Sequence, residues 1–160
     1  MKRILVFVFA MTFFFTGNIF CKDFDLNSFT DALLKNVQFS GTDEKSLITG
    51  SKSQSSSQPT ELSVVFEGYS LIYSKRGSNH ILKYAYFDPI FLKKIFDTDF
   101  SKYTAKDFEK NFLKPSIDPI ESGFNTVGYE IKYKDATINL YLYFSKYNGN
   151  ELQFIGFYFK

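Results

Sequence analysis

The C-terminal third of the chain begins with a run, 127–133, that alternates apolar residues with polar or small ones at a period of two. Only a β-strand turns that period into two distinct faces. Two further strand-like runs follow at 137–144 and 152–159. Asn148 and Gly149 separate the last two runs, and this dipeptide favours the positive backbone angles of a tight hairpin. The pattern therefore predicts three antiparallel strands in a meander.

The last two runs carry apolar side chains on both faces, which a strand with one wet face does not. Along 137–144 the aliphatic side chains point one way, and Tyr141 and Tyr143 point the other way. Tyr158 takes an equivalent position along 152–159. The favoured interpretation is a pair of central strands covered on both sides, because the predicted helices need a face to pack on. The alternative is a tyrosine surface, exposed or cupped, with Tyr141, Tyr143 and Tyr158 as the binding residues.

The remaining periodicities predict helices and further strands. Asp88–Pro89 supplies a cap and a first-turn proline, and Thr104 with Asp107 has the spacing of a capping box. Helices are expected at 22–37, 89–96 and 105–113, and additional strands at 62–67, 69–74 and 81–87. The predicted fold is α+β, with a single antiparallel sheet of about five or six strands and the N-terminal and central helices packed on it.

The amino-acid composition changes at 42–60, and this change divides the chain. Residues 51–58 are all polar and rich in Ser and Gln, so they have nothing to bury. The expected organisation is a signal peptide at 1–21, an N-terminal helix at 22–41, a flexible Ser/Gln-rich linker or loop at 42–60, and an α+β domain at 61–160.

The first 21 residues have the layout of a secretory signal. Lys2 and Arg3 precede an uncharged apolar run at 4–15, and the single cysteine, Cys21, closes the segment. Three fates are open: cleavage, lipidation of Cys21 as in a lipoprotein, or retention as an uncleaved anchor. Each fate predicts an exported protein, periplasmic or secreted, or alternatively a membrane-anchored lipoprotein.

The charge balance argues against a nucleic-acid surface. The whole chain has 19 basic and 17 acidic residues. Because Lys2 and Arg3 lie in the leader, the rest carries 17 of each and has no net charge. No basic cluster of the kind that displaces counterions from a phosphate backbone is present in the sequence. Nucleic acid is therefore not an expected partner.

Catalytic and cofactor patterns are weak. His80 is the only histidine, and it stands at the start of a predicted strand without a nucleophile motif. Asp97, Asp99 and Ser101 begin like a calcium loop, but the glycine and the glutamate that such a loop needs later are missing. We expect no enzymatic activity, no catalytic residue, no cofactor and no metal.

Together these features predict a small, exported, non-enzymatic binding protein of a bacterial cell envelope. Its partner would be a protein or an apolar ligand, with membrane association through Cys21 or the leader. One alternative is a carrier that holds a lipid-like ligand between the sheet and the helices, in a cavity lined by Phe108, Phe112, Ile138 and Leu142. The other is a hydrolase without a recognisable motif.

Overall fold

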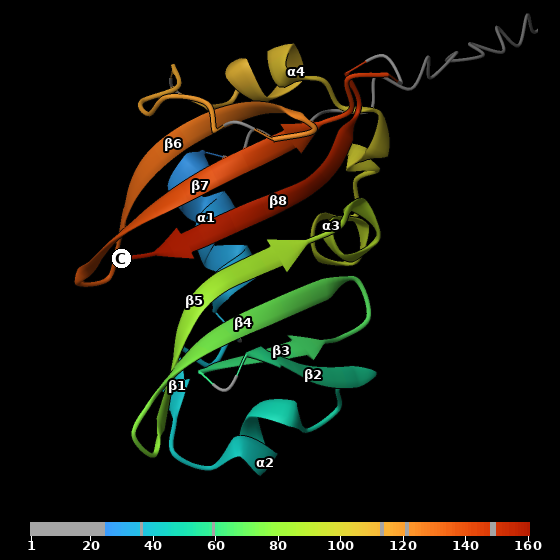
Figure 1. Ribbon diagram of the computed structural model, residues 1–160. Helices are drawn as coiled ribbons and strands as arrows, with labels where there is room; N and C mark the ends of the chain where they lie inside the picture. The colour runs from blue at the N-terminus through green and yellow to red at the C-terminus, as the bar shows by residue number, and fades with distance from the viewer. Residues whose placement is uncertain (1–24, 36, 59, 113, 121, 148–149) are drawn as a thin grey trace, which may run out of the picture.

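One antiparallel sheet of eight strands, with a few short helices on one side, makes up the fold (Figure 1). The computed structural model describes residues 25–160 except 36, 59, 113, 121 and 148–149. The helices are α1 (Leu26–Leu34), α2 (Glu44–Ile48), α3 (Pro89–Phe96), the 3-10 helix η1 (Phe100–Lys102) and α4 (Ala105–Glu109). The strands are β1 (Ser40–Gly41), β2 (Ser53–Gln58), β3 (Glu61–Val65), β4 (Tyr69–Arg76), β5 (Asn79–Phe87), β6 (Asn125–Tyr133), β7 (Ala136–Phe144) and β8 (Leu152–Phe159).

Neighbouring strands follow the order β2-β3-β4-β5-β8-β7-β6, and β1 pairs with the free part of β5. The C-terminal meander is confirmed, because β7 lies between β6 and β8. Two halves of the sheet meet where β5 pairs with β8, in the register Tyr84 with Tyr158 through Phe87 with Ile155. This junction brings residues about 70 positions apart in sequence onto neighbouring strands.

The α+β class and the single antiparallel sheet are confirmed, but the expected five or six strands are too few. The two extra strands are β1 and β2, and β2 lies with α2 in the segment 42–60 that was interpreted as a linker or loop. β2 pairs with β3, from Ser53 opposite Val65 to Gln58 opposite Glu61. An edge strand needs only backbone hydrogen bonds and no buried side chains, so a Ser/Gln sequence can form one without an apolar pattern.

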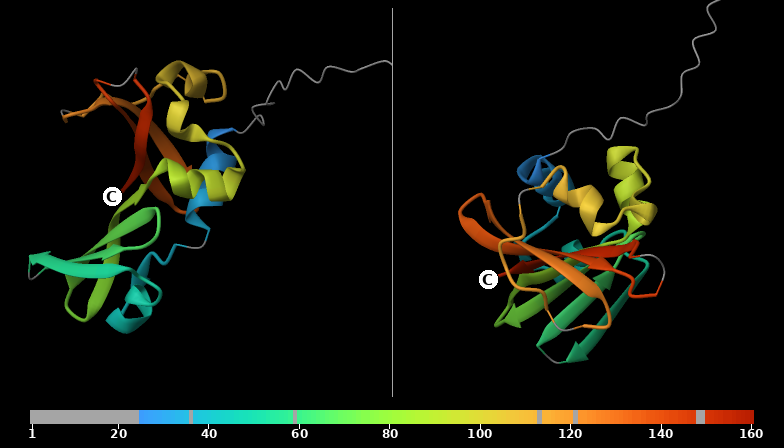
Figure 2. Two further views of the ribbon diagram at one scale, coloured as in Figure 1. Left: turned by 90° about the vertical axis from the view of Figure 1, so that its right-hand side faces the viewer. Right: turned by 90° about the horizontal axis from the view of Figure 1, so that it is seen from above.

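The helices cover one side of the sheet, here called the inner face (Figure 2). Phe29 of α1 is fully buried and contacts four other rings, Phe96, Phe100, Phe108 and Phe112. Inward side chains of every strand from β3 to β8 complete the same cluster. The core cluster therefore combines aliphatic and aromatic side chains, and it lies on the helical side.

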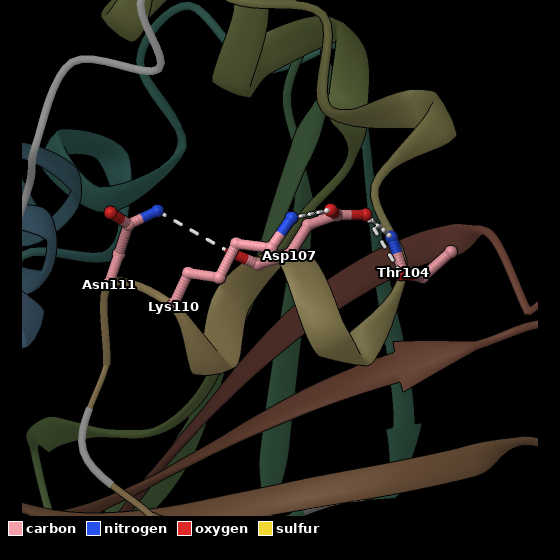
Figure 3. A network of polar contacts seen from close by, with 4 residues as sticks. All are labelled: Thr104, Asp107, Lys110 and Asn111. Carbon is pink, nitrogen blue, oxygen red and sulfur yellow. Dashed lines mark hydrogen bonds and ion pairs between the residues drawn. The ribbon is translucent and has the colours of Figure 1, made fainter.

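Side-chain caps define where the helices begin. Asp25 accepts hydrogen bonds from the backbone N–H groups of Asn27 (2.8 Å) and Ser28 (3.0 Å), and Asp88 accepts one from Phe91 (2.9 Å). In the expected capping box, the Asp107 carboxylate accepts from the backbone N–H of Thr104 at 3.0 Å (Figure 3). The hydrogen bonds that Asp107 accepts from the Thr104 backbone N–H and from the Thr104 hydroxyl hold the pKa of Asp107 below its usual value.

Candidate functional site: a tyrosine-lined pocket

Six aromatic side chains gather on the other side of the sheet, the outer face. They belong to three strands, and the register places them on one side because cross-strand partners share a face. Tyr84 is opposite Tyr158, and Tyr143 is opposite Phe154. We call the six the outer aromatic cluster: Tyr84, Tyr86, Tyr141, Tyr143, Phe154 and Tyr158.

Two glycines let these rings lie close to the backbone. A Cβ at Gly156 would stand 3.0 Å from Tyr143, 3.1 Å from Tyr86 and 3.2 Å from Tyr158. A Cβ at Gly128 would stand 2.8 Å from Tyr141 and 2.5 Å from Ile117. The strands thus carry no side chain where the rings need the space.

An irregular segment before β6 contacts that strand and part of the outer aromatic cluster. We call residues 115–120 and 122–124 the outer segment. The N–H groups of Ser116 and Ile117 donate to the carbonyl of Gly128, and Ser116 Oγ accepts from Glu130 N at 2.7 Å. This contact buries Tyr141, which is 7% exposed. The outer segment ends beside β8, where it forms the rim of a pocket.

The pocket has a volume of about 590 Å³ and opens on the outer face. That volume lies within the range of small-molecule sites. Its lining combines aromatic rings of the sheet with the end of the outer segment: Tyr86, Ile120, Ser122, Gly123, Phe124, Tyr143, Phe154 and Tyr158. Tyr143 stacks on Phe154 with ring centroids 4.2 Å apart, and Phe124 meets Phe154 edge-on at 5.2 Å.

A second cavity of about 540 Å³ adjoins the first and is more polar. It shares Ile120, Ser122 and Phe124 with the tyrosine-lined pocket, and its far side is formed by Asn125, Thr126 and Lys146, with Pro119. The Lys146 ammonium donates to the backbone carbonyl of Ser122 at 3.1 Å. A positive charge therefore stands at the wall between the two cavities.

The tyrosine hydroxyls of the pocket form a hydrogen-bonded group. The hydroxyl of Tyr143 pairs with that of Tyr158. Burial raises the pKa of Tyr143 to about 12. Burial, with a hydrogen bond to Tyr158, raises the pKa of Tyr86 further, and burial, with the hydrogen bond to Tyr143, does the same for Tyr158. All three phenols are neutral at physiological pH, and the pair of Tyr143 with Tyr158 uses one hydroxyl hydrogen and one oxygen lone pair of this group.

The predicted binding residues are brought together by the fold, with different degrees of exposure. Tyr141 is buried under the outer segment, Tyr143 is 3% exposed at the pocket wall, and Tyr158 is half-buried. The role of these three tyrosines as binding residues stays a prediction. Cys21, the candidate for lipidation, lies outside the described residues. Sequence reasoning missed Tyr86, Phe124 and Phe154 as pocket residues, although Gly156 between apolar and aromatic neighbours could have indicated a crowded face.

Other predicted features lie elsewhere. His80 is 4% exposed in β5, with its Nε2 atom 3.9 Å from a carboxylate oxygen of Glu44. Asp97 ends α3 in a left-handed conformation, and Asp99 caps η1 through Ser101. In the described ranges, no group of three or more His, Cys, Asp or Glu side chains is placed to hold a metal. The four residues expected to line a carrier cavity are members of the packed core.

A model of a protein family, described as Initiator Rep protein, WH2, matches residues 91–142, about a third of the chain. The match begins inside α3 and includes η1, α4, β6 and most of β7. It therefore covers the outer segment and part of the rim of the pocket. Searches of curated proteins and of solved structures found no match.

This match contradicts the expected function. An exported binding protein of a cell envelope was the wrong prediction, and so were its carrier and hydrolase alternatives, because the similarity is to a replication initiator. The expected periplasmic, secreted or membrane-anchored location is contradicted by the same match. None of the helices in the described part of the chain has the length and hydropathy needed to cross a bilayer.

The exclusion of nucleic acid as a partner is also contradicted. It was based on net charge and on the lack of a basic cluster. Net charge and basic clusters indicate only how a protein contacts phosphates. Proteins also bind nucleic acid when their aromatic side chains stack on the faces of its bases.

Proposed function

We propose that this protein binds DNA, as a replication initiator does. The observation that carries the proposal is the similarity of residues 91–142 to the WH2 segment of initiator Rep proteins. A winged helix contains two successive helices followed by a β-hairpin. The matched residues have that order here, with α3 and α4 followed by β6 and β7.

The charges of the matched segment set how strong such binding can be. Residues 91–142 contain eight Lys and eight acidic residues. Lys102, Lys106 and Lys110 belong to η1, α4 or the end of α4, and all three are exposed. With this balance we expect only a few phosphate contacts, so binding should be moderate and salt-dependent.

The helices limit how much of a duplex can be read. α4 has five residues, which correspond to about 7.5 Å of helix at 1.5 Å per residue. A recognition helix that short reaches few base edges in the major groove. We therefore propose that contacts outside α4 supply part of the affinity. We also propose that the protein acts by binding and not by catalysis.

Fluorescence anisotropy tests the proposal. Full-length protein is titrated into a labelled DNA duplex and into one strand of it, at low and at raised salt. The expected result is salt-dependent binding of at least one of the two forms. Absence of binding to both at low salt would overturn the proposal.

A matched pair of variants locates the contact. Lys106 and Lys45 are exposed lysines at the second position of two five-residue helices, α4 inside the matched segment and α2 outside it. Lys106→Glu should weaken DNA binding about fivefold and reduce the salt slope by about one, as expected for a lost phosphate contact. Lys45→Glu should leave binding nearly unchanged, and equal losses would count against the role of the matched segment.

A further inference from the structure

We infer that the tyrosine-lined pocket accepts one unstacked base of single-stranded DNA, with the adjoining cavity holding the phosphate beside it. This inference rests on the proposed DNA binding and goes beyond it, because the proposed function names neither the strand form nor the place of contact.

The aromatic lining favours a flat ligand. Tyr86, Tyr143, Phe154 and Tyr158 come from β5, β7 and β8, and Phe124 adds a ring from the outer segment. Tyr143 and Phe154 are stacked within 21° of parallel, and Tyr86 stands edge-on to Phe154 at 5.9 Å. Every base has a π-face, so such a lining binds bases with little regard to sequence.

The hydroxyls distinguish a base from a lipid tail. A site for an alkyl chain would leave the three phenols of the pocket facing hydrocarbon. Tyr86, Tyr143 and Tyr158 line the pocket as neutral phenols, and the pair of Tyr143 with Tyr158 leaves one hydroxyl hydrogen of that pair and further lone pairs for a ligand. The edge of a base carries complementary donors and acceptors, and proteins that bind single strands combine stacking with hydrogen bonds to those edges.

The charge beside the pocket fits a phosphate. Among the described residues that line the two cavities, Lys146 is the single charged side chain. Its ammonium stands at Ser122, which belongs to both linings. A nucleotide with its base among the tyrosines can place its phosphate in the polar cavity, where described lining residues present no carboxylate.

A base inside a duplex cannot occupy such a site, because it is stacked and paired. The pocket therefore predicts a preference for single strands. The preference should depend on the base as well as on the phosphates.

The experiment measures binding of the full chain to a labelled oligo(dT) strand, to an abasic oligonucleotide of equal length and charge, and to a duplex. Phe154→Leu removes a stacking ring and keeps an apolar side chain. Its matched control is Phe39→Leu, a half-buried phenylalanine at a separate cavity lined by Tyr133, Ala136 and Ile138. Circular dichroism of each variant checks that the fold is kept.

We expect oligo(dT) to bind at least tenfold more tightly than the abasic strand. Phe154→Leu should weaken oligo(dT) binding about tenfold, equivalent to about 1.4 kcal/mol. Phe39→Leu should leave it within about twofold. Lys146→Gln should reduce the salt slope by about 0.7, the value for one phosphate of a single strand.

A second measurement does not depend on the variants folding. Oligonucleotides that contain 5-iododeoxyuridine crosslink to aromatic side chains on irradiation, and peptide mass spectrometry locates the crosslink. Crosslinks to the aromatic lining support the inference, and crosslinks confined to residues outside the pocket overturn it. The lining rings are Tyr86, Phe124, Tyr143, Phe154 and Tyr158.

The outcomes separate the two proposals. Duplex binding with no preference for oligo(dT) over the abasic strand keeps the proposed function and overturns the base pocket. A preference for oligo(dT) that Phe154→Leu leaves unchanged, in a folded variant, also overturns the pocket. Absence of binding to every DNA tested overturns both.

Discussion

The inner and outer faces of one sheet use aromatic side chains for opposite purposes. On the inner face, Phe29, Phe100 and Phe108 come from the covering helices, are fully buried and pack against one another between helices and sheet. On the outer face, the outer segment covers Tyr141 but leaves a pocket of about 590 Å³ over β8 and β5. The same residue types therefore form a closed core on one side and an open site on the other. The two faces differ because helices cover the aromatic rings on the inner side, whereas the outer segment covers only part of those on the outer side.

The largest expected effect is the loss of a core ring. Phe29→Ala should lower the free energy of unfolding by about 3–5 kcal/mol, because the side chain is fully buried among four rings and leaves a cavity. Urea unfolding followed by circular dichroism measures it. Phe154→Ala should cost less than about 2 kcal/mol, since Phe154 is half-buried and water can fill the enlarged pocket. Equal costs would mean that the two faces are packed alike.

A backbone substitution tests the contact of the outer segment with the sheet. Gly128→Ala should destabilise the protein by about 1–3 kcal/mol, because the new Cβ would meet Ile117 at 2.5 Å and Tyr141 at 2.8 Å. Gly123→Ala is the matched control in the same region, since a Cβ there meets no atom within 4 Å. Urea unfolding of both variants measures the difference. A neutral Gly128→Ala would show that the outer segment shifts freely.

The inner face could be predicted from sequence to a greater extent than the outer one. Periodicity placed the helices and the C-terminal strands, and capping patterns at Asp88 and Thr104 placed two helix starts. The pocket could not be predicted in this way. It depends on the pairing of β5 with β8, and periodicity carries no information on which distant strands become neighbours. It depends also on the outer segment, which has no periodic pattern.

Tyrosine ionisation gives a pH test of both faces. Burial raises the pKa values of Tyr73 and Tyr129 on the inner face, and of Tyr143 on the outer face, to about 12 from 10.0. The unfolded chain loses these protons near pH 10 and the folded chain keeps them, so stability should fall between about pH 10 and pH 12. Below pH 10 these groups cause no change. The slope is about 1.4 kcal/mol per pH unit for each tyrosine.

Urea unfolding at several pH values, with ultraviolet absorbance to follow tyrosinate, measures this dependence. Tyr129→Phe should reduce the fall in the free energy of unfolding between pH 10 and pH 12 by the contribution of one tyrosine, about 1.4 kcal/mol per pH unit. Tyrosines that all ionise near pH 10 in the folded protein would contradict the burial of both faces.

The smallest expected effect compares single hydroxyl groups on the two faces. The Tyr129 hydroxyl is buried without a hydrogen-bond partner among the described residues. Removing it in Tyr129→Phe should leave stability unchanged or raise it by up to about 1 kcal/mol, since an unsatisfied polar group no longer has to be buried.

The Tyr158 hydroxyl is paired with that of Tyr143. Tyr158→Phe should lower stability by about 0.5–1 kcal/mol, near the low end for a hydrogen bond because water in the pocket can replace the lost partner. Opposite signs in urea unfolding would separate the unpaired hydroxyl of the inner face from the paired one of the outer face. A loss of about 2–3 kcal/mol in Tyr158→Phe would mean that the pocket is as dry as the core, because no water would then replace the lost partner of Tyr143.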